Sequence, residues 1–184
     1  MQRFFIFDSE RCFGCGGCVA ACVNANETTG KVMWRTVHKL PPHEGDHHTV
    51  YISMSCNHCE NPPCVKGCPT NALEKRESDG VVIHHKEKCV GCRYCQMTCP
   101  YGAPKWDETQ NIISKCHFCF ERLDQGGVPA CVETCFGGAI KQVLIGDDDD
   151  LKTYLKEQEG FIFMEKTRPA IRFVMPAKDE KENG

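Results

Sequence analysis

The fold of this chain is decided by the stretch Cys89-Val90-Gly91-Cys92-Arg93-Tyr94-Cys95-Gln96-Met97-Thr98-Cys99-Pro100. Its cysteines follow the spacing C-x2-C-x2-C-x3-C, which the run from Cys12 to Cys22 repeats. Two stretched versions complete the pattern, so all sixteen cysteines fall into four groups of four. The groups are Cys12, Cys15, Cys18 and Cys22; Cys56, Cys59, Cys64 and Cys68; Cys89, Cys92, Cys95 and Cys99; and Cys116, Cys119, Cys131 and Cys135.

This spacing is typical of bacterial [4Fe–4S] proteins, in which the first three cysteines of a run wrap one cluster. The fourth cysteine ligates the other cluster of a pair. With four thiolates per cluster, sixteen cysteines predict four [4Fe–4S] clusters. A chain with four redox centres is expected to transfer electrons.

Two other uses of cysteine compete with this interpretation. Paired CxxC units also hold structural zinc, and the group from Cys116 to Cys135 has the spacing of a zinc knuckle on its own. In a CxxCxxC run, however, the middle cysteine has no role at a single tetrahedral ion. A disulfide scaffold in a secreted protein is the second alternative. Disulfide frameworks show irregular spacings, and we expect no secretory signal in this chain.

The composition favours one small protein that is held together partly by metal. The 184 residues are 41% hydrophobic with cysteine included, so few aliphatic residues remain for a core. Metal–thiolate bonds that form only in the folded state add to its stability. The net charge is −3 and no basic stripe occurs, so no nucleic-acid partner is expected. No stretch approaches about 18 apolar residues, so no direct membrane span is expected.

The second and third cysteine groups form an internal repeat whose first cysteines are 33 residues apart. Between them we expect one helical turn over Thr70–Leu73 and a strand over Gly80–His84, entered by the Asp79-Gly80 turn. This arrangement resembles the two-cluster bacterial ferredoxin. We therefore predict an α+β fold of tandem bacterial-ferredoxin-like units, with short strands, short helices and long loops.

The inner ferredoxin-like module is expected at about residues 50–104, with a strand over Thr49–Met54. The outer module is expected to combine about residues 1–30 with 105–146, closed by pairing of strands Phe4–Phe7 and Ala139–Ile145. Residues 147–184 are expected to form a C-terminal extension. Within it we predict a helix beginning at Asp147–Asp150 and strands over Phe161–Met164 and Ile171–Val174. Pro176–Gly184 is expected to be a frayed tail or a partner-binding extension.

Because ligands cross between paired runs in two-cluster ferredoxins, we predict four ligand sets. Set A is Cys12, Cys15, Cys18 and Cys135; set B is Cys116, Cys119, Cys131 and Cys22; set C is Cys56, Cys59, Cys64 and Cys99; set D is Cys89, Cys92, Cys95 and Cys68. Crossing in the outer pair, A and B, is a hypothesis because its two runs are far apart in the sequence. Backbone N–H groups of the loops are expected to donate to the cluster sulfurs.

Other residue types offer no competing chemistry. His58 and His117 lie between cluster cysteines, where a side chain either hydrogen-bonds to sulfur or points outward. Trp106 is expected to pack in the core. No phosphate-binding loop, nucleophile–base pair or nicotinamide fingerprint occurs, so no catalytic residue is predicted. Five further histidines are expected to be exposed in loops or strands: His43, His47, His48, His84 and His85.

Longer motifs carry a specific resemblance over about residues 4–145. They are Ser55-Cys56-Asn57-His58-Cys59-Glu60-Asn61-Pro62-Pro63-Cys64, Cys99-Pro100-Tyr101-Gly102-Ala103-Pro104, Lys115-Cys116-His117-Phe118-Cys119 and Pro129-Ala130-Cys131-Val132-Glu133-Thr134-Cys135. The chain resembles the four-cluster iron–sulfur subunit of molybdopterin oxidoreductases such as anaerobic dimethyl sulfoxide reductase and polysulfide reductase. Family members often carry Pro after the last cysteine, where this chain has Phe136, and only a local change is expected there.

The resemblance implies a non-catalytic subunit that relays electrons between a molybdopterin (Mo or W) catalytic subunit and a quinone-reactive membrane subunit. It implies that sets A and B lie nearer the catalytic subunit, and sets C and D nearer the membrane anchor. It also implies membrane association through these partners, on the extracytoplasmic side by co-export with the large subunit. The alternatives are a cytoplasmic location, and a free-standing or hydrogenase- or formate-dehydrogenase-associated polyferredoxin.

Overall fold

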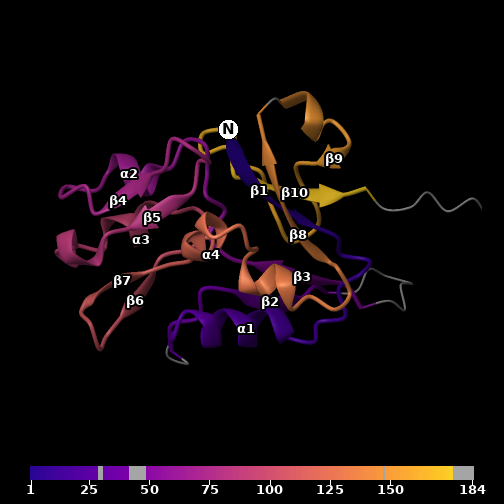
Figure 1. Cartoon of the computed structure of the whole chain (residues 1–184), viewed down its shortest axis with the longest axis horizontal. Coiled ribbons are helices and arrows are strands. Elements are labelled where there is room, and N and C mark those ends of the chain that lie inside the picture. The colour runs from indigo at the N-terminus through magenta and orange to yellow at the C-terminus, as the bar shows by residue number, and fades with distance from the viewer. Residues whose placement is uncertain (29–30, 42–48, 147, 176–184) are drawn as a thin grey trace, which may run out of the picture.

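The computed structural model describes residues 1–28, 31–41, 49–146 and 148–175, and its elements are short (Figure 1). The fold is α+β, as predicted. The strands are β1 Gln2–Phe7, β2 Thr36–Lys39, β3 Tyr51–Met54, β4 Leu73–Lys75, β5 Val82–His84, β6 Lys105–Asp107, β7 Ile112–Ser114, β8 Ile140–Ile145, β9 Tyr154–Leu155 and β10 Ile171–Val174. The α-helices are α1 Gly17–Ala25, α2 Pro63–Lys66, α3 Tyr94–Thr98, α4 Phe120–Asp124 and α5 Ala130–Glu133; Lys86–Lys88 and Asp148–Leu151 form 3-10 turns.

A four-stranded sheet in the order β8-β1-β10-β9 forms the largest element of the fold. Strand β1 pairs antiparallel with β8, which confirms the predicted closure of the two outer segments. All four residues from Phe4 to Phe7 are buried, because alternate side chains point to opposite faces and both faces are covered. Phe5 and Phe7 pack in one apolar cluster, and Phe4 and Ile6 in another.

The segment after β8 is built into this sheet rather than appended to it. Strand β10 pairs parallel with β1 and antiparallel with β9, so the predicted strand at Ile171–Val174 is confirmed. The predicted helix after Asp147–Asp150 is wrong: only one 3-10 turn forms, and Tyr154 and Leu155 lie in β9. The predicted strand at Phe161–Met164 is also wrong, since Phe161 makes one isolated bridge to Gln158. Asp147 and the tail 176–184 lie outside the described residues.

Three antiparallel hairpins, β2–β3, β4–β5 and β6–β7, accompany the sheet. Strands β3 and β5 fulfil two of the predictions, but Leu73 begins strand β4 instead of ending a helical turn. In Figure 1, β4–β5 and β6–β7 lie on the same side of the molecule, away from the four-stranded sheet. Ile113 of β7 is buried with Leu73 and Val82, and Trp106 of β6 packs against them. The hairpin 105–114 therefore packs with the inner residues, although it was expected in the outer module.

Helices α2 to α5 have only four or five residues each. Isolated helices of this length are unstable because nucleation is not repaid by further turns. Each of them starts within or directly after a cysteine loop, at Pro63, Tyr94, Phe120 and Ala130. Their stability must therefore come from what the neighbouring cysteines bind and from packing.

Candidate iron–sulfur sites

Three internal cavities are each lined by four cysteines. The first is lined by Cys22, Cys116, Cys119 and Cys131; the second by Cys68, Cys89, Cys92 and Cys95; the third by Cys56, Cys59, Cys64 and Cys99. The structure thus brings together the side chains of sets B, D and C, with one cysteine of each set arriving from a different run.

The side chains of set A also lie together. Burial raises the pKa of Cys12, and the neighbouring thiols Cys18, Cys135 and Cys15 raise it further. Helix α1 carries Cys18 and Cys22 on one turn, so it contributes one cysteine to set A and one to set B. Helix α5 packs on α1 and brings Cys131 and the following Cys135 to the same two sets.

The cysteines line the walls of the cavities and do not converge on a point. Within the described parts of the chain, no three cysteine, histidine or carboxylate side chains are close enough to hold one metal ion. A tetrahedral zinc ion needs each sulfur about 2.3 Å from one centre. The donor sets, four thiols around each cavity with no carboxylate among them, instead fit a larger group with several iron corners.

Burial makes these thiols weak acids in the metal-free chain. It raises the pKa of Cys22, Cys59 and Cys64 to about 12 and that of Cys95 to about 11, and neighbouring cysteines add to the shift. Burial raises the pKa of Cys116 as well. Since thiolates are the ligands, binding of metal must release protons from these groups.

Backbone N–H groups point at several sulfurs. The N–H of Ala72 donates to Cys68 Sγ at 3.2 Å, and that of Phe118 donates to Cys116 Sγ at 3.4 Å. At Cys68 burial acts to raise the pKa, but hydrogen bonds around Thr70 and Leu73 outweigh it and lower the pKa overall. The loops provide the donors that stabilise thiolate charge.

One glycine is required for the loop of the third group to close. Gly91 adopts φ +69°, a conformation that favours glycine. A Cβ atom at this position would lie 2.8 Å from the backbone oxygen of Asn111, in the turn between β6 and β7. The hairpin 105–114 therefore sits directly against the cysteine loop, and the indole of Trp106 lies under the guanidinium of Arg93, 3.7 Å from its ring centroid. Trp106 is half-buried in this contact rather than fully enclosed in the core.

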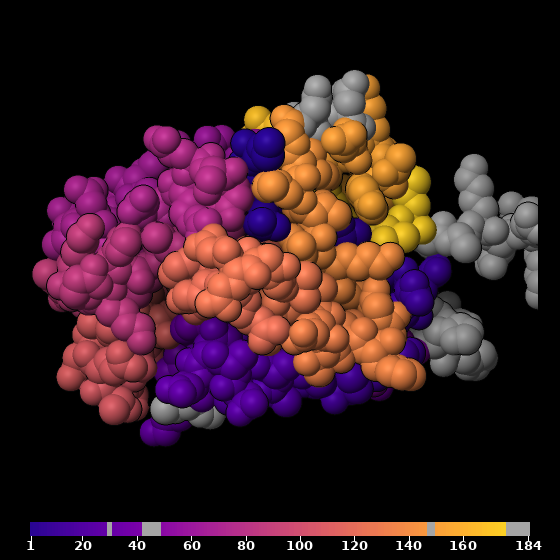
Figure 2. All heavy atoms as spheres, in the orientation of Figure 1, coloured from indigo at the N-terminus to yellow at the C-terminus, as the bar shows by residue number. Residues whose placement is uncertain are grey.

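The four sets follow one another as neighbours in the order A, B, C, D, a succession called the line below. Three buried apolar clusters each contain cysteines of two neighbouring sets: Cys18 with Cys131, Cys116 with Cys56, and Cys64 with Cys95. The two ends are the most accessible, because Cys15 of set A and Cys92 of set D are exposed. In the middle, every cysteine of set B is buried. Figure 2 shows the orange segment with α4 filling the space between the inner residues and the N-terminal segment.

Two buried cations lie at the middle of this line, and sequence reasoning missed both. Arg35 is 3% exposed, and its guanidinium donates to Ser53 Oγ at 3.0 Å and to Ser55 Oγ at 2.9 Å. Burial acts to lower its pKa, but the nearby thiols of sets A and B outweigh it, so the pKa is raised. Lys115 is 2% exposed and lines the cavity of set C. No periodic or spacing signal marks these cations, apart from the position of Lys115 beside Cys116.

Two histidines that were expected to be exposed are not. His84 and His85 are half-buried, and His84 lines the cavity of set D. His58 and His117 line the cavities of sets C and B, so neither points outward. His43, His47 and His48 lie outside the described residues.

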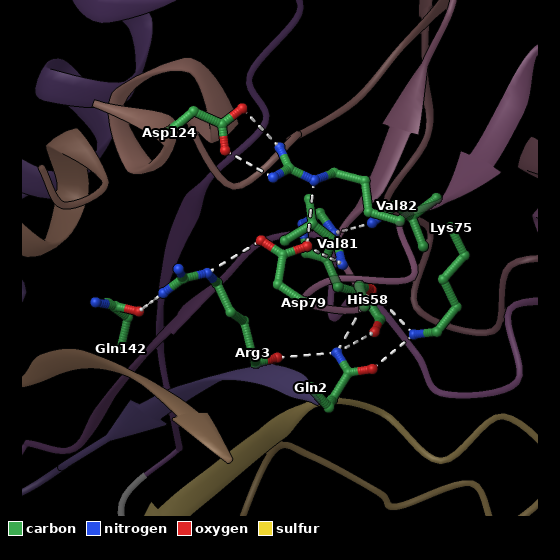
Figure 3. A network of polar contacts seen from close by, with 11 residues as sticks. Gln2, Arg3, His58, Lys75, Asp79, Val81, Val82, Asp124 and Gln142 are labelled. Atoms are coloured by element: carbon green, nitrogen blue, oxygen red, sulfur yellow. Dashed lines mark hydrogen bonds and ion pairs between the residues drawn. The ribbon is translucent and has the colours of Figure 1, made fainter. Parts of the chain in front are cut away.

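A buried carboxylate joins the β4–β5 hairpin to the four-stranded sheet (Figure 3). Asp79 is 4% exposed and contacts Arg3 Nε at 3.2 Å and Arg76 Nε at 3.3 Å. Arg3 also donates to Gln142 of β8 at 2.7 Å, and Arg76 binds both oxygens of Asp124 at 3.0 and 2.6 Å. Two arginines and two carboxylates thus connect inner residues with β1, β8 and α4 across the middle of the line.

Comparison with known proteins agrees with this geometry. Two family models described as 4Fe–4S dicluster domain match, one over residues 47–144 and one over residues 11–72. The chain is 40% identical to the B component of anaerobic dimethyl sulfoxide reductase of Escherichia coli (strain K12), over 95% of this chain and 86% of the relative. It is 37% identical to the B component of tetrathionate reductase of Salmonella typhimurium (strain LT2), over 97% of this chain and 67% of the relative.

A third relative is the hydrogenase-2 operon protein HybA of Escherichia coli O157:H7, 34% identical over 83% of this chain and 54% of the relative. Phe136, at the position where family members often carry Pro, is 98% exposed and takes no part in the core. Among the described residues, no helix has the length and hydrophobicity to cross a membrane. This protein belongs to the 4Fe–4S dicluster family, among the iron–sulfur electron-transfer subunits of the dimethyl sulfoxide reductase and tetrathionate reductase type.

Proposed function

We propose that this chain carries four [4Fe–4S] clusters, held by sets A, B, C and D, and relays electrons along that line. The observation that carries the proposal is the order of the four cysteine sets. Every cysteine of set B and three of the four in set C are buried, whereas sets A and D each have an exposed cysteine. When bound, the clusters supply one-electron chemistry. The chain holds them in order and excludes water from the middle of the relay.

Electrons enter and leave at the two ends. Around set A the side chains of Phe13 and Phe136 are exposed, and around set D those of Val90, Tyr94 and Met97 are exposed. Exposed apolar side chains beside a redox centre suit docking of another protein. We assign the set A end to a large molybdopterin-containing catalytic subunit and the set D end to a quinone-reactive membrane subunit, as the family resemblance implies. In this assignment, the outer module with sets A and B faces the catalytic subunit. The inner module with sets C and D faces the membrane subunit.

The location follows from these partners. The complex is membrane-associated through its anchor subunit, with this chain on the extracytoplasmic side after co-export with the large subunit; the alternative is cytoplasmic. A second function, a polyferredoxin that serves a hydrogenase, is favoured by the similarity to HybA.

Metal content and partners test the proposal. Protein purified without oxygen from its native host is expected to be brown, to contain about 16 iron and about 16 sulfide per chain, and to co-purify with a large molybdopterin protein. Zinc in place of iron and sulfide would reject the clusters. A full set of clusters in a chain that co-purifies with a hydrogenase, or with no large subunit, would favour the polyferredoxin.

The crossing of Cys22 into set B has its own test. Replacing Cys22→Ser is expected to remove or convert the cluster of set B, because one of its four thiolates is lost, and to leave the cluster of set A intact. EPR of the reduced protein reads this out, with Cys12→Ser and Cys119→Ser as markers for the signals of sets A and B. Ala20→Ser, an exposed change on the same helix, is the control. Loss of the set A signal with set B intact would refute the crossing.

A further inference from the structure

Two buried donors without a protein partner line the cavity of set C. Asn57 and His58 occupy the loop between Cys56 and Cys59, and they are 2% and 0% exposed. Both line the cavity. Asn57 Nδ2 and His58 Nε2 are each shielded from solvent and make no hydrogen bond within the described residues. A buried polar group without a partner destabilises the fold, so two such groups in one loop require an acceptor.

The proton of His58 is placed by its neighbour. The N–H of Val82 donates to His58 Nδ1 at 3.0 Å, a contact seen in Figure 3. Since Nδ1 is an acceptor, the neutral ring carries its proton on Nε2.

The carbonyl group of Val82 also has a hydrogen-bond partner. Lys115 Nζ donates to the oxygen of Val82 at 2.5 Å and to that of Cys116 at 2.7 Å. The backbone on which the His58 ring rests is therefore fixed from two directions, and the ring cannot turn without breaking the contact to Val82. The Phe118 ring, 5.2 Å from that of His58, offers only the face of an aromatic ring as an alternative acceptor.

We infer that the side chains of Asn57 and His58 donate hydrogen bonds to the cluster held by set C and thereby raise its reduction potential. The inference rests on the proposed function. Reduction adds one negative charge to the cluster, and N–H donors to its sulfurs stabilise that charge. The cavity of set D contains no unpartnered buried donor within the described residues, so its cluster serves as an internal reference.

Redox titration followed by EPR tests the inference, with the set C signal assigned by its loss in Cys64→Ser. His58→Leu and Asn57→Leu are each expected to shift the midpoint potential of this cluster to a lower value and leave that of set D unchanged. His58→Gln, whose Nε2 keeps a donor at similar reach, is expected to restore most of the shift. His85→Leu, a half-buried histidine that pairs with Glu74 and lines none of the three cysteine cavities, is the matched control.

A second readout works on the unaltered protein. With ¹⁵N-histidine incorporated, pulsed EPR of the reduced set C cluster is expected to detect coupling to one histidine nitrogen, and His58→Gln abolishes it. An unchanged potential in both leucine variants together with no ¹⁵N coupling would overturn the inference, and point to the Phe118 ring as the acceptor. If the unaltered protein shows no cluster signal that is lost in Cys64→Ser, the proposed function is rejected instead.

Discussion

Removal of iron with a chelator under anaerobic conditions is expected to unfold the half of the chain around sets C and D. There the strands β4 to β7 have three residues each, and the buried core consists of Leu73, Val82 and Ile113 besides two cysteines. Metal sites with comparable thiolate donors contribute about 10–16 kcal/mol to folding. That matches or exceeds the about 5–15 kcal/mol of a whole domain, so this part cannot fold without metal.

The four-stranded sheet is expected to respond differently. Its core contains Phe4, Phe5, Phe7 and Phe173, and its pairing of β1 with β8 extends over six residues. Hydrogen exchange measured by mass spectrometry should show amides of β5 and β7 losing protection in the metal-free chain, while β1 and β10 keep part of theirs. Protection that stays equal in β5 and β7 after complete removal of iron would contradict the dependence of this half on clusters. Reconstitution with iron and sulfide is the control for reversibility.

Replacing Asp79→Ala is expected to destabilise the loaded protein by about 3 kcal/mol. The change leaves the guanidinium of Arg3 without its buried carboxylate and removes one of two partners from Arg76. Breaking a buried pair costs about 3–5 kcal/mol, and the lower end applies because both arginines keep some contact with solvent. Denaturation followed under anaerobic conditions measures the free energy of unfolding.

Asp79 also joins the two halves of the relay, so the variant has a second expected effect. Looser contact between the β4–β5 hairpin and β1 broadens the distribution of distances between the clusters of sets B and C. Spin–spin interaction in EPR of the fully reduced protein should become weaker or more heterogeneous. Lys31→Ala, which breaks the exposed ion pair with Glu108, is the matched control and should change neither quantity. An Asp79→Ala protein with unchanged stability would show that the network contributes nothing net.

The cysteine pattern made much of the fold predictable. Sequence reasoning predicted the α+β ferredoxin-like class, the pairing of Phe4–Phe7 with Ala139–Ile145, and the strand at Ile171–Val174. It failed after residue 146. The spacing of Leu151, Tyr154 and Leu155 predicted a helix, but Leu151 ends a 3-10 turn and the other two residues form a strand. Apolar spacing over so short a segment does not distinguish the two. It also divided the chain at 104, although Ile113 and Trp106 pack with the inner residues.

The cysteine sites also have features that the sequence predicts and features that it does not. The spacing within each cysteine run is a local property, because a loop of seven residues can wrap one cluster without any distant contact. The sequence alone therefore determined the donor type, the number of donor groups and the family. The partners of those groups come from far along the chain: Asp79 meets Arg3, Lys115 meets Val82, and Val82 meets His58. Only the tertiary structure decided these contacts, because burial creates the need for a partner and long-range packing selects which side chain supplies it.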